Sequence, residues 1–146
     1  MAEKPSFRNS FKKRRCLIPA SGFYEWKKVN EKTKIPTWIY PADSSYFLFA
    51  VIWDSWHPKE NENECILTTA ILTTEPNSLM KSIHDRMPVI LPRDAIDIWL
   101  DEKIQDAEKL SKYIKPFSEK LMKAHPVSQL VNSPRNDGPE CIQEPT

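Results

Sequence analysis

The sequence predicts an α+β domain that is mainly antiparallel β, with a few peripheral helices. Short apolar and β-branched runs follow one another closely, and turn-forming residues separate them. Only two segments place apolar residues at helical spacing. The chain has 146 residues, of which 40% are hydrophobic, and no repeat, low-complexity tract or linker marks a second domain. We therefore expect residues 1–146 to form a single domain.

The expected strands are short, and most of them lie in the first half of the chain. Residues 1–12 are polar and lack periodicity, so no regular structure is expected there. Strands are expected at residues 16–19, 23–29, 37–40, 46–53 and 65–73, with a charged turn at 30–34, a hairpin loop at 41–45 and a polar loop at 55–64. A further strand is expected over 121–131, interrupted at Pro126, and the tail from Asn132 is expected to be irregular.

Two helices are expected in the second half. Residues 93–100 follow a proline and carry apolar side chains at positions i, i+3 and i+4. Residues 106–114 place their apolar side chains on one face in the same way, and Pro116 ends the segment.

The charge balance limits the kinds of partner. The formal net charge is only +1, so no overall electrostatic field demands a nucleic acid or a membrane. Basic residues are concentrated in the first quarter, and the run at residues 12–15 either holds phosphates or forms a solvated surface. No apolar segment is long enough to cross a bilayer, and the N-terminus lacks a secretory leader. We therefore expect a cytoplasmic protein without a membrane partner.

The cysteines and histidines indicate neither disulfides nor metal. The three cysteines, Cys16, Cys65 and Cys141, form no C-x-x-C pair, and an odd number of cysteines is typical of a reducing compartment. Cys16 and Cys65 lie in apolar runs and are expected in the core. The three histidines are far apart and lack ligand spacing with the cysteines, so we expect no metal site and no cofactor.

The first candidate for chemistry is a carboxylate between two aromatic residues. Glu25 lies between Tyr24 and Trp26, just after one of only two glycines. Aromatic neighbours lower the local polarity, which raises the pKa of a carboxyl group and suits it to proton exchange. The alternative is an amphipathic strand with Glu25 facing solvent.

The second candidate is the sequence SIHDRMP at residues 82–88. His84 can exchange protons near neutral pH, and Arg86 can grip a phosphate or carboxylate through two hydrogen bonds. Asp85 either orients one of these neighbours or faces water. The alternative is a surface turn with an exposed histidine and an Asp–Arg pair. A hydrolase triad using Ser21 and His84 is disfavoured, because Ser21 lacks the strand–turn–helix context of a nucleophile elbow.

Four motifs occur in a defined order along the chain. They are RCLIPASGFYEW at residues 15–26, TA at 69–70, HDRMP at 84–88, and VS followed by VN within 127–132. Together they resemble the SOS response-associated peptidase (SRAP) family, whose members shield abasic sites in single-stranded DNA after DNA damage. The resemblance covers nearly the whole chain and implies a curved, barrel-like antiparallel core.

The resemblance also implies a chemistry and a set of site residues. In the family, an N-terminal cysteine exposed by autoproteolytic Met removal condenses with the abasic sugar aldehyde to a thiazolidine crosslink. By matching position, Glu25 handles protons at the amine and in Met removal, and His84 assists sugar ring opening and crosslink reversal. Arg86 holds a backbone phosphate, and Arg14 and Arg15 contact the DNA strand with salt-dependent affinity.

The chain departs from the family at its start, where Met1 is followed by Ala2 instead of cysteine. It resembles the C-terminal two-thirds of the family domain and lacks the N-terminal segment. We therefore expect unpaired strand edges, with self-association or pairing with a complementary N-terminal fragment. Two interpretations stay open: a lesion-processing protein whose cysteine is supplied separately, or a non-catalytic remnant that at most binds single-stranded DNA. A protease for foreign substrates is supported only by the family's name.

Overall fold

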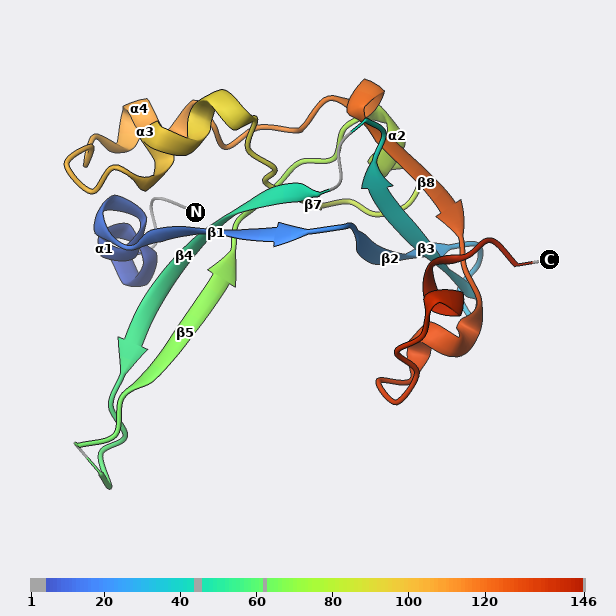
Figure 1. Ribbon diagram of the computed structural model, residues 1–146, viewed down its shortest axis with the longest axis horizontal. Helices are drawn as coiled ribbons and strands as arrows, with labels where there is room; N and C mark the ends of the chain where they lie inside the picture. The colour runs from blue at the N-terminus through green and yellow to red at the C-terminus, as the bar shows by residue number, and fades with distance from the viewer. Residues whose placement is uncertain (1–4, 44–45, 62, 146) are drawn as a thin grey trace. The chain divides into compact units, whose positions relative to one another are not determined.

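The computed structural model describes residues 5–43, 46–61 and 63–145 (Figure 1). Its helices and strands, in chain order, are α1 (Pro5–Lys13), β1 (Arg15–Ala20), β2 (Phe23–Lys28), β3 (Lys34–Pro41), β4 (Phe47–Trp56), β5 (Ile66–Ile71), β6 (Thr73–Thr74), α2 (Ser78–Lys81), β7 (Met87–Pro88), α3 (Ile96–Leu100), α4 (Ala107–Ser111) and β8 (Met122–Pro126). Short 3-10 helices lie at Arg93–Ala95, Glu119–Leu121, Gln129–Asn132 and Pro139–Ile142. Antiparallel sheets with a few short helices confirm the predicted α+β class. No helix within the described ranges is long and apolar enough to cross a membrane.

The chain folds into two compact units, and it passes between them several times. Unit 1 comprises residues 1–19, 48–74 and 88–115, and unit 2 comprises residues 20–47, 75–87 and 116–146. Each unit is built from segments that are far apart in the sequence. The expectation of a single domain over residues 1–146 stays a prediction.

Unit 1 contains a three-stranded sheet in the order β1-β4-β5. Strands β4 and β5 pair antiparallel, from Val51 opposite Ile71 to Trp56 opposite Ile66. The core of the unit consists of buried apolar side chains: Phe11, Ala50, Ile52, Leu72, Val89, Leu91, Trp99 and Leu110. Cys65 is exposed just before β5, so its expected place in the core was wrong, because only one edge of this strand is paired and both faces are accessible.

Helix α1 occupies most of the segment that was expected to be irregular. Residues 5–12 are helical because Phe11 buries its ring against Trp99, with ring centroids 6.0 Å apart. A nine-residue helix is marginal by itself, since most helical stability in proteins comes from packing of an apolar side. A single buried aromatic residue is too little pattern to predict such a helix from the sequence.

Arg15 has a structural role in unit 1. Its side chain is buried, with the residue 8% exposed, and burial lowers the pKa of its guanidinium. The guanidinium donates hydrogen bonds to five backbone carbonyls, which belong to Phe11 (3.1 Å), Lys12, Trp99 (2.6 Å), Asp101 (2.7 Å) and Ile104 (3.0 Å). Arg15 therefore ties the end of α1 to the segment that follows α3.

We expect Arg15→Met to destabilise the protein strongly. The substitution leaves several carbonyls in a buried region without their charged donor, which costs about 3 kcal/mol of unfolding free energy. For a chain of this size that corresponds to a melting temperature lower by about 9 °C, measured by circular dichroism. Arg8→Met, which changes an exposed residue of the same helix, is the control. Equal losses for the two variants would contradict the structural role of Arg15.

Unit 2 contains a second antiparallel sheet in the order β2-β3-β8. Strands β2 and β3 form a hairpin from Phe23 opposite Ile39 to Lys28 opposite Lys34, closed by the charged turn that the sequence predicted. Strand β8 pairs with the other edge of β3, so β3 is the central and most buried strand.

Two expectations in unit 2 were wrong. The segment at 41–45 was expected to be a hairpin loop, but β3 and β4 belong to different sheets, because turn-forming residues do not specify which strands pair. Ser44 and Ser45 lie outside the described residues. The strand expected over 121–131 ends at Pro126, and a 3-10 helix follows, capped by Ser128, whose hydroxyl accepts the Leu130 amide at 3.3 Å.

Candidate functional site

The two residues singled out for proton transfer come together within unit 2. His84 Nε2 lies 3.9 Å from Glu25 Oε2. The Glu25 side chain is 24% exposed and that of His84 is 43% exposed, so a ligand can reach both groups. A carboxylate and an imidazole from distant parts of the sequence therefore face each other on an accessible surface.

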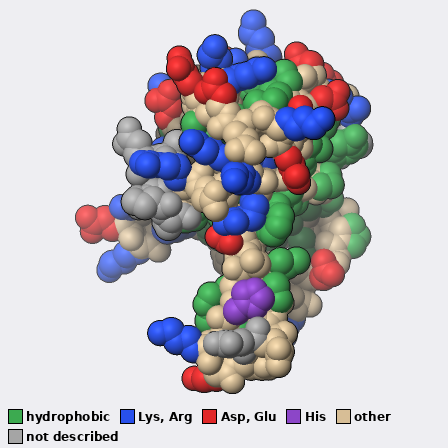
Figure 2. Space-filling view, turned by 90° about the vertical axis from the view of Figure 1, so that its left-hand side faces the viewer, with side chains coloured by type: hydrophobic (Ala, Val, Ile, Leu, Met, Phe, Trp, Pro, Cys, Tyr) green, Lys and Arg blue, Asp and Glu red, His purple; other side chains and the backbone are tan. Residues whose placement is uncertain are grey.

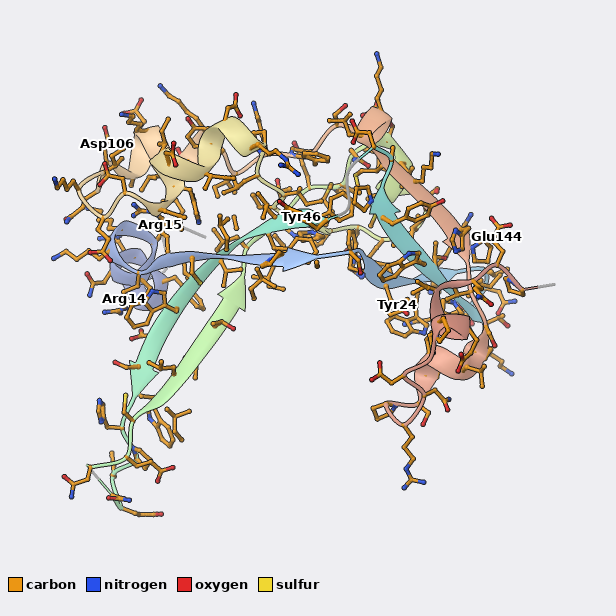
Figure 3. The ribbon with its side chains drawn as sticks, viewed as in Figure 1. Arg14, Arg15, Tyr24, Tyr46, Asp106 and Glu144 are labelled. Carbon is orange, nitrogen blue, oxygen red and sulfur yellow. The ribbon has the colours of Figure 1, made fainter. Side chains whose placement is uncertain are left out.

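Strand β2 directs Glu25 away from its two aromatic neighbours. The Tyr24 ring, labelled in Figure 3, packs on Trp38 with centroids 4.8 Å apart, and its hydroxyl donates to the Cys141 carbonyl at 3.1 Å. The Trp26 indole lies on the same side as the Tyr24 ring, with centroids 6.5 Å apart. Since side chains alternate along a strand, Glu25 points to the opposite face. The expected aromatic walls around Glu25 were wrong.

The pKa of Glu25 is nevertheless raised, as the sequence predicted. Burial of the carboxyl group is the main cause, and the nearby charge of Asp85 raises the pKa further. The charge of His84 and a hydrogen bond from the Trp26 backbone oppose the rise. A carboxyl group whose pKa is raised toward neutral pH exchanges protons more readily at physiological pH. The alternative of a fully solvated Glu25 does not hold.

The raised pKa predicts that Glu25→Gln stabilises the protein at neutral pH. The folded state binds the Glu25 proton more tightly than the unfolded state, so stability falls as pH rises from the unfolded pKa through the folded pKa. Above that window the wild type carries the cost of a partly buried charge, which Gln lacks. We expect a higher melting temperature for Glu25→Gln at pH 7 and a difference that vanishes near pH 4, measured by thermal denaturation. A variant less stable at pH 7 would contradict the shift.

Helix α2 holds His84 in place, and it was not predicted. Asn77 caps this helix, because its side-chain oxygen accepts the Met80 amide at 2.9 Å. The Asn77 side-chain amide donates to the Phe117 carbonyl at 2.8 Å, and the residue is 7% exposed. The His84 amide then donates to the Met80 carbonyl at 2.8 Å. A four-residue helix is too short for periodicity, so the capping asparagine was the one signal available.

Polar groups of its own loop surround Nδ1 of the His84 ring. Nδ1 lies 3.1 Å from the Arg86 amide and 3.2 Å from the Arg86 carbonyl, and the tautomer decides which of the two it bonds. Asp85 Oδ1 lies 3.2 Å from the same nitrogen. These contacts orient the ring with Nε2 toward Glu25.

The three arginines proposed to contact DNA do not share one environment. Arg86 is exposed and lies two residues after His84 in unit 2. Arg14 belongs to unit 1, where its guanidinium pairs with Asp54 at 3.0 Å and donates to the Trp53 carbonyl at 3.2 Å. Figure 3 shows Arg14 and Arg15 beside α1. The guanidinium of Arg15 is buried and donates its hydrogen bonds to backbone carbonyls, so we assign Arg15 no DNA contact.

The charged surface of the helical side of unit 1 is mixed. Figure 2 shows Lys and Arg side chains lying among Asp and Glu side chains on this face, instead of forming an uninterrupted basic patch. Within the described residues, no three His, Cys, Asp or Glu side chains gather in a way that could hold a metal ion. The arrangement that remains for chemistry is the Glu25–His84 pair.

A carboxyl–imidazole pair thus lies at an accessible position on an antiparallel α+β scaffold. The profile of the SOS response associated peptidase (SRAP) family matches residues 1–134. The chain belongs to this family, which confirms the resemblance read from its four motifs.

The relatives carry consistent names. "Abasic site processing protein YoqW" of Bacillus subtilis is 45% identical over 143 residues, which are 98% of this chain and 63% of that protein. "Abasic site processing protein HMCES" of Xenopus tropicalis is 35% identical, over 97% of this chain and 47% of its own length. A crystal structure of a Bacteroides thetaiotaomicron protein superposes with a TM-score of 0.89 at 35% identity. That match covers 99% of this chain and 62% of the solved chain. The chain thus spans less than two-thirds of these proteins.

Proposed function

We propose that this chain processes abasic sites in single-stranded DNA, with Glu25 and His84 moving protons at the opened sugar. The observation that carries the proposal is the Glu25–His84 pair itself, with 3.9 Å between carboxylate and imidazole and a raised pKa at Glu25. The names of the relatives supply the substrate class. The pair places a carboxyl group and an imidazole, two groups that can exchange protons, side by side.

The chemistry of the lesion fits such a pair. An abasic deoxyribose opens to a C1′ aldehyde when its ring oxygen takes up a proton and the C1′ hydroxyl loses one. His84, whose Nε2 faces the site, suits this exchange. An amine that then attacks C1′ forms a carbinolamine, and Glu25 in its acid form protonates the hydroxyl that leaves as water. In the complete family domain, a cysteine thiol adding to the resulting imine closes a thiazolidine.

Arg86 is proposed to hold a phosphate of the damaged strand next to His84. Its guanidinium can grip phosphate oxygens through two parallel hydrogen bonds. A contact of this kind positions the strand without reading its sequence. An unpaired abasic nucleotide needs no base to be extracted from a stack, so the sugar reaches the site at low cost.

The test mixes the chain with a single strand that contains one natural abasic site, and analyses it on a denaturing gel with and without borohydride. A band retained only with borohydride means that an amine forms the imine, and a band that needs no reductant means that a thiol has closed a stable adduct. The same strand with a tetrahydrofuran analogue, which has no aldehyde, is the control. If neither lane shows a band while a full-length relative crosslinks the same strand, the proposed chemistry is wrong for this chain. The chain is then a remnant that at most binds the strand.

A further inference from the structure

Asn77 is a buried polar residue of unit 2 whose hydrogen bonds reach beyond the helix that it caps. It is 7% exposed. Its side-chain oxygen accepts the Met80 amide at 2.9 Å, and its side-chain amide donates to the Phe117 carbonyl at 2.8 Å. A backbone N–H only donates and a carbonyl only accepts, so a single orientation of the Asn77 amide satisfies both bonds. A cap needs only the first bond, so the second one requires a separate reason.

The first bond leads from Asn77 to His84. Asn77 holds the Met80 amide, and the Met80 carbonyl in turn accepts the His84 amide at 2.8 Å. The Asn77 carbonyl also accepts the Lys81 amide at 2.9 Å, which closes the helical turn between them. The backbone of His84 is therefore only two hydrogen bonds away from the Asn77 side chain, so a displacement of that side chain moves the histidine as well.

Asn77 also joins the two ends of the segment that carries His84. Its backbone amide donates to Met87 Sδ at 3.4 Å, and Met87 follows the histidine in the chain. A thioether sulfur is a weak acceptor, but Met87 is 1% exposed, so the contact is shielded from water. The segment from Asn77 to Met87 is thus closed at its ends, with His84 inside it.

The second side-chain bond leads toward the strand that carries Glu25. The Phe117 ring packs edge-on against Phe47 with centroids 6.0 Å apart, and Phe47 packs against Phe23 at 6.1 Å. Phe47 is 2% exposed, so this run of rings has little room to rearrange. Phe23 lies two residues before Glu25 in β2, and residues two apart along a strand share a face. Packed rings therefore connect Asn77 with the sheet face that presents Glu25.

Asn77 touches the same sheet face directly. Its side-chain amide lies 3.2 Å from Met122 Sδ at the start of β8, and Met122 is 4% exposed. Met122 is opposite Pro41 in the β3–β8 ladder, and Glu25 is opposite Thr37 in the β2–β3 ladder. Opposed residues stand on one face, and positions 37 and 41 of β3 point to the same side. Met122 and Glu25 therefore share a face.

We infer that Asn77 is the positioning residue that fixes the separation of Glu25 and His84, an inference that rests on the proposed function. Its side-chain oxygen sets the histidine through α2, and its side-chain amide sets the distance of α2 from the sheet. All the residues that carry these contacts belong to unit 2. A misplacement of about 1 Å at a reacting group costs up to about 100-fold in rate, so the pair needs such a support.

A purely local capping role makes a different prediction. Asn and Ser cap helices about equally well through a side-chain oxygen, but a serine hydroxyl occupies the position of only one of the two groups of Asn77. Asn77→Ser therefore keeps the cap of α2 and removes the bond to the Phe117 carbonyl. A capping role predicts wild-type behaviour for this variant, whereas a positioning role predicts a defect at the Glu25–His84 pair.

The first experiment uses the full chain without DNA, with isotope-labelled histidine. The NMR signal of the His84 ring is recorded with and without Glu25→Gln, and the displacement of the signal reports how closely the carboxyl group approaches the ring. In the Asn77→Ser background we expect this displacement to fall to about half of its wild-type value or less. Asp106→Ala, which removes the side-chain cap of α4 in unit 1, is the matched control and should leave the displacement unchanged.

The second measurement follows adduct formation with abasic DNA. Asn77→Ser is expected to lower the rate at saturating DNA by about 10- to 100-fold. Binding of a strand with the tetrahydrofuran analogue should stay at the wild-type level, because the variant disturbs the reacting pair and leaves the exposed surface intact. Phe47→Leu keeps an apolar side chain in place but interrupts the run of rings, so it is expected to reduce the NMR displacement in the same direction.

A folded Asn77→Ser variant with the wild-type displacement would overturn the inference, and so would equal losses of displacement in Asn77→Ser and Asp106→Ala. If circular dichroism shows that Asn77→Ser does not fold, Phe47→Leu decides, and a wild-type displacement in that variant would overturn the inference. The NMR measurement involves no DNA, so its result is independent of the gel assay, whose failure would count against the proposed function alone.

Discussion

Glu25→Gln is expected to slow formation of the borohydride-trapped adduct with abasic DNA by about 10²–10⁴-fold. General acid–base catalysis by a positioned side chain contributes a factor of this size, and Gln keeps the shape of Glu but cannot give up or take a proton. The rate is measured from the adduct band over time, at saturating DNA. Glu31→Gln, at an exposed position in the turn of the same hairpin, is the control and should react at the wild-type rate.

A double-variant experiment shows whether Glu25 and His84 act together. His84→Gln alone is expected to slow the same step, and the double variant should be little slower than Glu25→Gln. Residues that work as one unit give effects that do not add. Fully additive losses would contradict a coupled pair, and an unchanged rate for both single variants would remove the pair from the mechanism.

Gly22→Ala is expected to disrupt the sheet that carries Glu25. A Cβ at Gly22 would meet the Ile39 backbone oxygen and two atoms of the Trp38 ring, at 2.5 and 2.7 Å. Neither neighbour can yield, because Ile39 belongs to the central strand and Trp38 is 9% exposed and packed on Tyr24. We expect a loss of about 3 kcal/mol in unfolding free energy, as for other overpacked positions, with slower adduct formation because β2 shifts.

Gly138→Ala is the control for this prediction. The atoms nearest to a Cβ at Gly138 belong to the carboxyl group of Glu140, which is exposed and flexible enough to rotate away. We expect its melting temperature to lie close to that of the wild type. Equal melting temperatures for Gly22→Ala and the wild type would show that the sheet tolerates the added methyl group, and would contradict the close packing of β2 on β3.

The sequence predicted the strands of the β2–β3 hairpin and the 93–100 and 106–114 helices well, because periodicity and turn residues are local signals. Prediction from the sequence was less successful for elements whose formation depends on packing against distant segments. Helix α1 depends on one ring buried against Trp99, and α2 is four residues long and held by the Asn77 cap. Short elements stabilised by distant partners leave too little local pattern to be recognised.

For the site, the sequence singled out Glu25 and His84 as separate candidates, and a family resemblance joined them. It also predicted the direction of the Glu25 pKa shift, but for a wrong reason, since Tyr24 and Trp26 face away from the carboxylate. Arg15 looked like a phosphate ligand in a basic run, whereas its donors satisfy backbone carbonyls inside unit 1. A charge in a sequence does not reveal whether it is solvated or buried.

The sequence by itself determined the α+β class, the family and the two residue types that can exchange protons, since these depend on local pattern and on chemistry carried by single side chains. Only the tertiary structure decided that Glu25 and His84 face each other and which sheet face Glu25 uses. Those features require the β2–β3 register and the turn after α2 together. Contacts between segments distant in sequence arise from packing, which no local pattern encodes.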